Sequence, residues 1–294
     1  MQFIHSFLRY IQYEKRGSHH TVIAYEGDLT QFYHFLELNH STDWTLGTFR
    51  HIRQWMVNML DAGVTARTVN RKVATLKSFF RFLLREGVIE NTPTDKVITP
   101  KTPKRLPVFV KEHEMDQLLD CVEFGDAYPG VRNKLMIDLF YLSGMRLSEM
   151  SSLTLADVDL SGGVIKVTGK RNKQRIIPFA SKMQQSIVDY LLVRKQTFGE
   201  ACGTHLFLTD KGAPIYNKLI YRVVTSHLAM VTTMAKRSPH ILRHTFATAL
   251  LNHGADLNAI KELMGHANLS ATEIYTHNTF EQLNTIYKQA HPRA

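Results

Sequence analysis

Five residues with the chemistry needed to bind and break a phosphodiester occur along this chain. They are Arg146, His240, Arg243, His266 and Tyr275, and the last four lie in the final third of the sequence. The planar donors of arginine match the oxygens of a phosphoryl group, and histidine exchanges protons near neutral pH. A tyrosine hydroxyl can attack an electrophile and form a covalent ester. The set therefore predicts phosphoryl transfer through a tyrosyl ester, without a metal ion.

His240 and Arg243 are three residues apart in a segment that opens with a Ser-Pro pair, which is a typical helix start. Residues at this spacing share one face of a helix, and the N-terminus of a helix attracts anions. We therefore expect both side chains to approach the same phosphate. His244 and His253 are expected to be structural histidines with satisfied hydrogen bonds.

The other three residues have plainer alternatives. Arg146 follows a Ser-Gly pair and precedes the LSEM segment, where a surface ion pair with Glu149 would also explain it. His266 follows a Met-Gly pair at a predicted helix end, where it could instead cap the helix dipole. Tyr275 is one of eleven tyrosines and is distinguished only by its position after His266, so Tyr287 is the weaker alternative nucleophile.

Four segments together carry a resemblance to a known family: LSGMRLSEMSSLTLADVDL, GKRNKQR, HILRHTFATALL and LMGHANLSATEIYTH. In this order they resemble the tyrosine recombinase (phage integrase) family, and most closely its bacterial Xer-type members. The resemblance covers nearly the whole chain, because the N-terminal part is similar to the family's core DNA-binding domain. Ser143, Met150 and Ala249 depart from common family residues, and none of them has a predicted chemical role.

The resemblance implies how the phosphate is held. Arg146 and Arg243 would clamp it, with Glu149 orienting Arg146. His266 would donate to a non-bridging oxygen, and His240 would accept or position the proton of the nucleophile. Together these donors would stabilise the charge of a pentacovalent transition state.

The resemblance also implies the course of the reaction. Tyr275 would attack phosphorus, leaving a 3′-phosphotyrosyl link and a free 5′-hydroxyl. Lys170, or alternatively Lys173 in the same turn, would protonate the departing 5′-oxygen. No Walker loop is present, and Cys121 and Cys202 lack metal-ligand spacing, so neither ATP, a metal nor another cofactor is expected.

A Pro-rich basic segment divides the chain. Residues 91–107 hold four of the nine prolines and four basic residues, which predicts an extended linker. The predicted fold is mainly α, with a small β-hairpin in the catalytic domain. We expect a helical, SAM-like core DNA-binding domain over 1–90 and a mixed α+β catalytic domain over 108–294, which ends in a tail helix at 279–290.

Hydrophobic periodicity sets the expected elements. Before the linker, helices are predicted over 1–14, 20–38, 48–61 and 65–86. After the linker, helices are predicted over 112–122, 131–142, 181–196, 216–234, 240–253, 256–264 and 270–275. Strands are predicted over 164–168 and 175–179, on either side of the turn that holds Lys170.

The helix over 65–86 has one basic and one apolar face. The basic face holds Arg67, Arg71, Lys77, Arg81 and Arg85. A helix that is merely solvated normally mixes charge signs, so we predict that this face contacts DNA phosphates, with a solvated face as the alternative. The formal net charge of +10 also favours a polyanionic partner.

The expected partner is a double-stranded DNA recombination site, bound by a homo- or hetero-tetramer whose subunits join through the C-terminal tail. No signal peptide or membrane-spanning run is apparent, so a cytoplasmic, nucleoid-associated protein is predicted. The alternatives are the integrase of a small mobile element, a relaxing enzyme like type IB topoisomerases, and a non-catalytic DNA-binding protein. A two-domain recombinase for chromosome or plasmid dimer resolution is preferred, because an additional arm-binding domain has no room in this chain.

Overall fold

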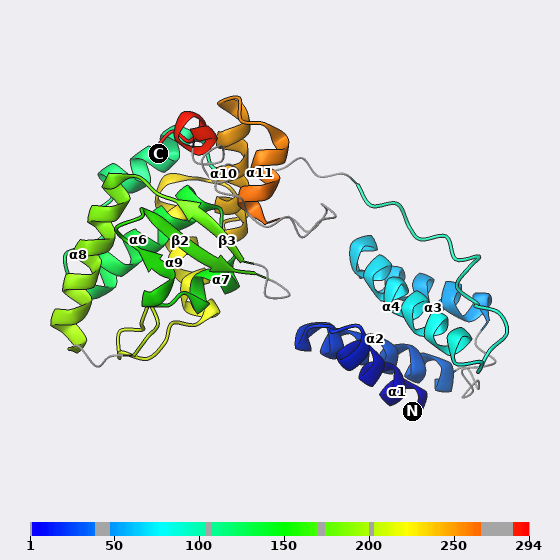
Figure 1. The fold of residues 1–294 in the computed structure, drawn as a ribbon. Coiled ribbons are helices and arrows are strands. Elements are labelled where there is room, and N and C mark those ends of the chain that lie inside the picture. The colour runs from blue at the N-terminus through cyan, green and yellow to red at the C-terminus, as the bar shows by residue number, and fades with distance from the viewer. Residues whose placement is uncertain are drawn as a thin grey trace. The chain divides into compact units, whose positions relative to one another are not determined.

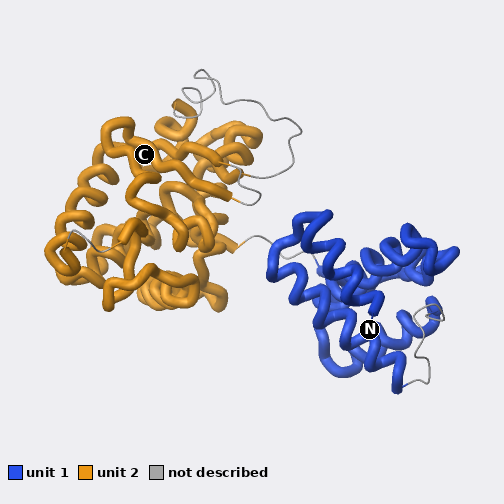
Figure 2. Tube along the Cα trace, turned by 60° about the horizontal axis from the view of Figure 1, so that its bottom comes forward, with its two compact units in different colours: residues 1–105 blue, residues 106–294 orange. Residues whose placement is uncertain are grey.

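The computed structural model describes residues 2–38, 48–103, 108–169, 174–199, 203–265 and 285–293. The chain divides into two compact units, residues 1–105 and residues 106–294 (Figure 2). Helices dominate both units, and a three-stranded antiparallel sheet belongs to the second (Figure 1). The predicted fold class, mainly α with a small sheet, is therefore confirmed.

The N-terminal unit is a set of helices around one apolar core. Its elements are α1 (Gln2–Arg9), which continues as a π-helical turn (Tyr10–Glu14), α2 (His19–Leu38), α3 (Phe49–Asp61) and α4 (Ala66–Arg85). The Thr65 hydroxyl accepts from the backbone N–H of Thr68 and so caps the start of α4. The apolar face predicted for this helix is fully buried, at Val69, Val73, Leu76, Phe80 and Leu83.

The C-terminal unit packs helices against one face of its small sheet, whose other face is exposed (Figure 1). Its helices are α5 (Glu112–Asp116), which continues as a π-helical turn (Gln117–Cys121), α6 (Tyr128–Ser143), α7 (Leu147–Ser152), α8 (Ser181–Phe198), α9 (Asn217–Val231), α10 (Pro239–Asn252) and α11 (Leu257–Met264). The sheet order is β1 (Val158–Asp159), β2 (Val164–Thr168) and β3 (Gln174–Pro178), with Ile165 opposite Ile177. Strand β3 lies against α11.

Helix α6 is the central element of this unit. Eleven of its sixteen residues are buried, and it packs against both α8 and α10, as expected for a helix that is apolar on most sides. It ends at Gly144, whose φ of 55° is a left-handed conformation that favours glycine. A Cβ at this position would come within 2.3 Å of the Phe246 ring, so only glycine allows this close approach of α10. Arg146 follows this turn by two residues, at the start of α7.

The structure adds elements that the sequence did not predict. Strand β1 pairs with β2, although its two residues are too few to show an alternating pattern. The single helix expected over 112–122 is a short α-helix followed by a π-helical turn. The helix expected over 270–275 lies outside the described residues. In the described part of the chain, no helix combines the length and the apolarity needed to cross a bilayer.

Candidate active site

Arg146 is held at the start of α7 by Glu149. The backbone N–H of Arg146 donates to Glu149 Oε2 at 2.7 Å, and its Nη1 donates to Oε1 at 2.7 Å. The Arg146 side chain is 38% exposed, whereas that of Glu149 is only 2% exposed. The buried carboxylate thus fixes the backbone and the side chain of Arg146 while leaving part of its guanidinium open to solvent.

Arg243 lies on α10 and is buried. Its guanidinium donates to the backbone carbonyls of Gly144 and Met264. Burial, together with the nearby charges of Arg146 and Arg175, lowers the pKa of Arg243 to about 10. Arg243 therefore remains protonated at neutral pH, near the charge of Arg146. That the two arginines bind one phosphate remains a prediction.

A third arginine, Arg175 of β3, joins this cluster, and sequence reasoning missed it. Its Nη1 and Nη2 donate to the two oxygens of Glu149 at 3.1 and 2.8 Å, and the residue is 5% exposed. Strand alternation offered a signal, because Arg175 is in phase with Ile177, which faces the core at 2% exposure. An arginine on the buried face of a strand must have a partner in the core.

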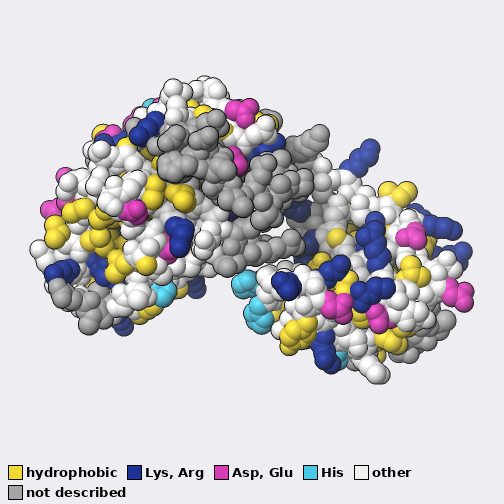
Figure 3. Space-filling model, in the orientation of Figure 1, with side chains coloured by type: hydrophobic (Ala, Val, Ile, Leu, Met, Phe, Trp, Pro, Cys, Tyr) yellow, Lys and Arg dark blue, Asp and Glu magenta, His cyan; other side chains and the backbone are white. Residues whose placement is uncertain are grey.

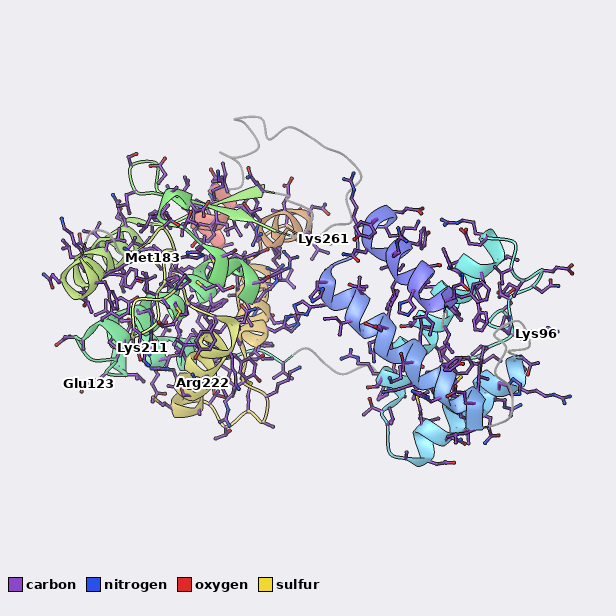
Figure 4. The ribbon with its side chains drawn as sticks, turned by 90° about the horizontal axis from the view of Figure 1, so that it is seen from below. Lys96, Glu123, Met183, Lys211, Arg222 and Lys261 are labelled. Carbon is purple, nitrogen blue, oxygen red and sulfur yellow. The ribbon has the colours of Figure 1, made fainter. Side chains whose placement is uncertain are left out.

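The three arginines meet at the C-terminal end of α11. Arg175 Nε donates to the carbonyl of residue 263 at 2.8 Å, Arg243 to that of residue 264, and Arg146 to that of residue 265 at 3.0 Å. The last carbonyls of a helix lack donors within the helix and carry partial negative charge. Each of three successive carbonyls therefore has an arginine of its own, from three different elements. Lys261 marks α11 in Figure 4.

The cluster carries excess positive charge. Burial raises the pKa of the Glu149 carboxyl, but hydrogen bonds and charge from Arg175 and then Arg146 outweigh burial and lower it to about 2. One carboxylate opposite three arginines leaves two net positive charges. A phosphodiester brings about one negative charge and develops a second in a pentacovalent transition state, so this cluster suits such a group.

His240 lies in the first turn of α10 and is exposed. Its Nε2 is 3.0 Å from Nε2 of His244, so one ring donates to the other. Burial, then His244, Lys236 and Arg243 lower the pKa of His240. His244, expected to be a structural histidine with satisfied hydrogen bonds, thus has the predicted proton acceptor His240 as its hydrogen-bond partner.

Three predicted site residues lie outside the described part of the chain. These are Lys170, His266 and Tyr275. Lys173, the alternative to Lys170, lies outside it as well. In the sequence, both lysines fall between the end of β2 at Thr168 and the start of β3 at Gln174. Helix α11 ends at Met264, two residues before His266. The described structure therefore brings together Arg146, Glu149 and Arg243, with His240 on the helix that carries Arg243.

The basic face of α4 is only partly free for a ligand. Figure 3 shows Lys and Arg side chains over α4 on the visible face of the N-terminal unit. Arg67 and Arg81 are exposed, and Lys77 is half-buried. Arg71 pairs with the buried Asp28 through both terminal nitrogens.

Arg85 also has partners within the N-terminal unit. It pairs with Glu86 at 2.8 Å and lies over the Tyr10 ring at 4.1 Å. Its guanidinium is therefore already engaged within the N-terminal unit.

Comparison with known families assigns both units. The Phage integrase family matches residues 108–282, and the Phage integrase, N-terminal SAM-like domain matches residues 4–87. The chain therefore belongs to the phage integrase family of tyrosine recombinases.

Its curated relatives include the tyrosine recombinase XerC of Chlorobaculum tepidum, 40% identical over 98% of this chain and 94% of that protein. The XerC of Bacillus subtilis is 36% identical over 99% of this chain and 97% of that protein. The resemblance to Xer-type members is confirmed.

Solved structures show the same fold. XerH site-specific recombinase bound to palindromic difH substrate, in a post-cleavage complex, matches with a TM-score of 0.73 and 22% identity, over 96% of this chain and 93% of that one. The Tn1549 transposon integrase in complex with circular intermediate DNA matches with a TM-score of 0.70 and 21% identity, over 95% of this chain and 98% of that one.

Proposed function

We propose that this chain is a Xer-type site-specific recombinase that cuts and rejoins duplex DNA through a 3′-phosphotyrosyl intermediate. The observation that carries the proposal is the gathering of Arg146, Arg175 and Arg243 at the end of α11. This cluster has net positive charge. The end of α11, where it lies, directly precedes in sequence the segment that contains His266 and Tyr275. A DNA-binding protein without catalysis would not need such a cluster.

For each step of the proposed reaction, this chain contains a side chain that can carry it out. Arg146 and Arg243 bind the non-bridging oxygens of the scissile phosphate, with His266 as a further donor. The Tyr275 oxygen forms a bond to phosphorus while the bond from phosphorus to the 5′-oxygen breaks. Lys170 gives its proton to the departing oxygen, so that a 5′-hydroxyl is released.

His240 takes up the proton that the Tyr275 hydroxyl loses. Its pKa is lowered, first by burial and then by His244, so its neutral, accepting form is available at neutral pH. A tyrosine hydroxyl ordinarily titrates near pH 10 and needs such a base together with nearby positive charge. The phosphotyrosyl ester can then be attacked by a 5′-hydroxyl of another strand, which regenerates Tyr275 and completes strand exchange.

The partner is a DNA recombination site. XerH and the Tn1549 integrase, which share this fold, were each solved bound to DNA. The exposed arginines of α4 provide phosphate contacts in the N-terminal unit. We place the protein on the nucleoid, as a tetramer joined by its C-terminal tails, and we favour dimer resolution over a mobile-element role because XerC relatives match this chain along almost their whole length.

A trapping experiment tests the proposal. Wild-type protein is incubated with a library of nicked duplexes in which cleavage releases a short fragment, so that religation is prevented. We expect an adduct that survives denaturation, and sequencing of its DNA gives the recombination site. Tyr275→Phe should form no adduct, while the matched control Tyr287→Phe should form it normally, because Tyr287 is 1% exposed in the core. Absence of any adduct with the wild-type protein would contradict the proposed chemistry.

A further inference from the structure

Glu149 is shared between two arginines of unequal exposure. Arg146 donates to Oε1, and Arg175 donates to both oxygens. The Arg175 side chain is 5% exposed, whereas that of Arg146 is 38% exposed. All three nitrogens of Arg175 already donate within the protein, Nε to the Leu263 carbonyl and both Nη to Glu149. An arriving phosphate therefore contacts Arg146 rather than Arg175.

We infer that Arg175 is a positioning residue that compensates the charge of Glu149, so that Arg146 keeps its own charge for the scissile phosphate. This inference rests on the proposed function. A buried carboxylate with a single arginine partner would neutralise that arginine, because the two charges attract strongly where water is excluded. With Arg175 present, the four side chains Arg146, Arg175, Arg243 and Glu149 carry two net positive charges, and without it they carry one.

Arg175 also fixes the carbonyls on which the other two arginines rest. Its Nε donates to the carbonyl of Leu263 at 2.8 Å, one residue before the carbonyl that accepts from Arg243. A Cβ at Gly265 would lie 3.3 Å from the Arg175 side chain, so the end of α11 packs closely on this arginine. Removal of Arg175 would therefore leave the charge of Glu149 to Arg146 alone and would disturb the backbone that orients Arg146.

The test compares two DNA substrates in single-turnover cleavage. One is ordinary DNA, and the other carries a neutral methylphosphonate at the scissile position, which removes one negative charge from the transition state. Arg175→Met keeps the length of the side chain but removes its charge. On ordinary DNA we expect its cleavage rate to fall on the order of tenfold or more. On the methylphosphonate the fall should be markedly smaller, because less charge needs the clamp.

Arg132→Met is the matched control. Arg132 is also buried, at 2% exposure, and pairs with Asp210 at 2.6 Å. It lies in the first half of α6, whereas the site lies beyond the other end of this helix, at Gly144. Its loss should lower the melting temperature and reduce cleavage of both substrates by the same factor. A purely structural role for Arg175 would give this same pattern.

A double variant supplies the second measurement. Arg175→Met with Glu149→Gln removes the buried carboxylate together with its partner and restores two net positive charges. It should cleave ordinary DNA faster than Arg175→Met alone. If the single variant does not fold, a folded double variant that still cleaves DNA shows that what must be compensated is the charge of Glu149. Equal losses of Arg175→Met on both substrates, or a double variant that is as slow as the single one or inactive, would overturn the inference. Failure of the wild type to cleave would instead refute the proposed function.

Discussion

At the scale of single residues, the site depends on carbonyls as much as on side chains. Arg146, Arg175 and Arg243 are each oriented by a backbone oxygen at the end of α11. The types and order of chemical residues in the sequence predicted Arg146, Glu149 and Arg243. They did not predict Arg175, because its role follows from tertiary contacts with Glu149 and Leu263 that no local pattern contains.

The histidine pair of α10 gives a prediction about pH. Partial burial and then His244 lower the pKa of His240, so His240 stays in its neutral, proton-accepting form at a lower pH than an isolated histidine would. His244→Ala should raise the pKa of His240. The acid limb of the pH–rate profile for single-turnover cleavage should then move to higher pH. Cleavage should be about threefold to tenfold slower near pH 6 and nearly unchanged near pH 8.

His253→Ala is the control for this pair, because His253 Nδ1 contacts the Ala249 carbonyl at the other end of α10. It should leave the acid side of the pH profile in place. An unchanged profile in His244→Ala would mean that His244 does not set the protonation of His240.

At the scale of elements, hydrophobic periodicity predicted the helices and strands that are long and regular. Helix α4 and the β2–β3 hairpin lie within a residue or so of their expected positions, because each carries several turns or alternations of an apolar pattern. Strand β1 and the π-helical turns are too short for such a signal. The partners of the basic face were also unpredictable, since Asp28 is on α2 and more than forty residues from Arg71.

The structure divides the basic face of α4 into free and engaged arginines. Arg67 and Arg81 are exposed, so each change to Ala should lower the slope of log binding constant against log salt by about one. Arg85 is held by Glu86 and Tyr10, so Arg85→Ala should change the slope less and serves as the matched control. Titration of a duplex site at several salt concentrations measures this. Unchanged slopes for Arg67→Ala and Arg81→Ala would show that the face is only solvated.

At the scale of the whole molecule, the C-terminal tail lies on its own catalytic unit. Residues 285–290 are helical, and Tyr287 and Ala290 are buried with Phe246 and Leu250. His291 Nε2 is 3.1 Å from the Tyr141 carbonyl oxygen. The sequence left open whether this amphipathic segment packs on its own domain or on a neighbour, because its pattern fixes a buried face and not the chain that covers it.

The last ion pair of the tail allows the two kinds of docking to be distinguished. Arg293 donates to Asp120 at 2.9 and 2.5 Å and to Asp116 at 2.9 Å. Arg293→Asp places a third carboxylate beside Asp116 and Asp120 within one chain, and Asp120→Arg places a second guanidinium beside Arg293. Each variant alone should therefore bind a paired DNA site with reduced cooperativity.

A mixture of the two variants restores matched charges only between chains. In the Arg293→Asp variant, position 293 is acidic and meets the basic position that Asp120→Arg creates in its neighbour. The unchanged Arg293 of that neighbour meets an unchanged Asp120, so every junction of an alternating ring is matched. If the tails are exchanged between neighbours on DNA, the mixture should recover cooperative binding and recombination that neither variant shows alone.

The measurement is the gel shift of a two-half-site duplex, with a single half-site as control. A mixture no better than its components would mean that the tail acts only within its own chain. In that case deletion of residues 285–294 should lower the melting temperature and leave cooperativity intact.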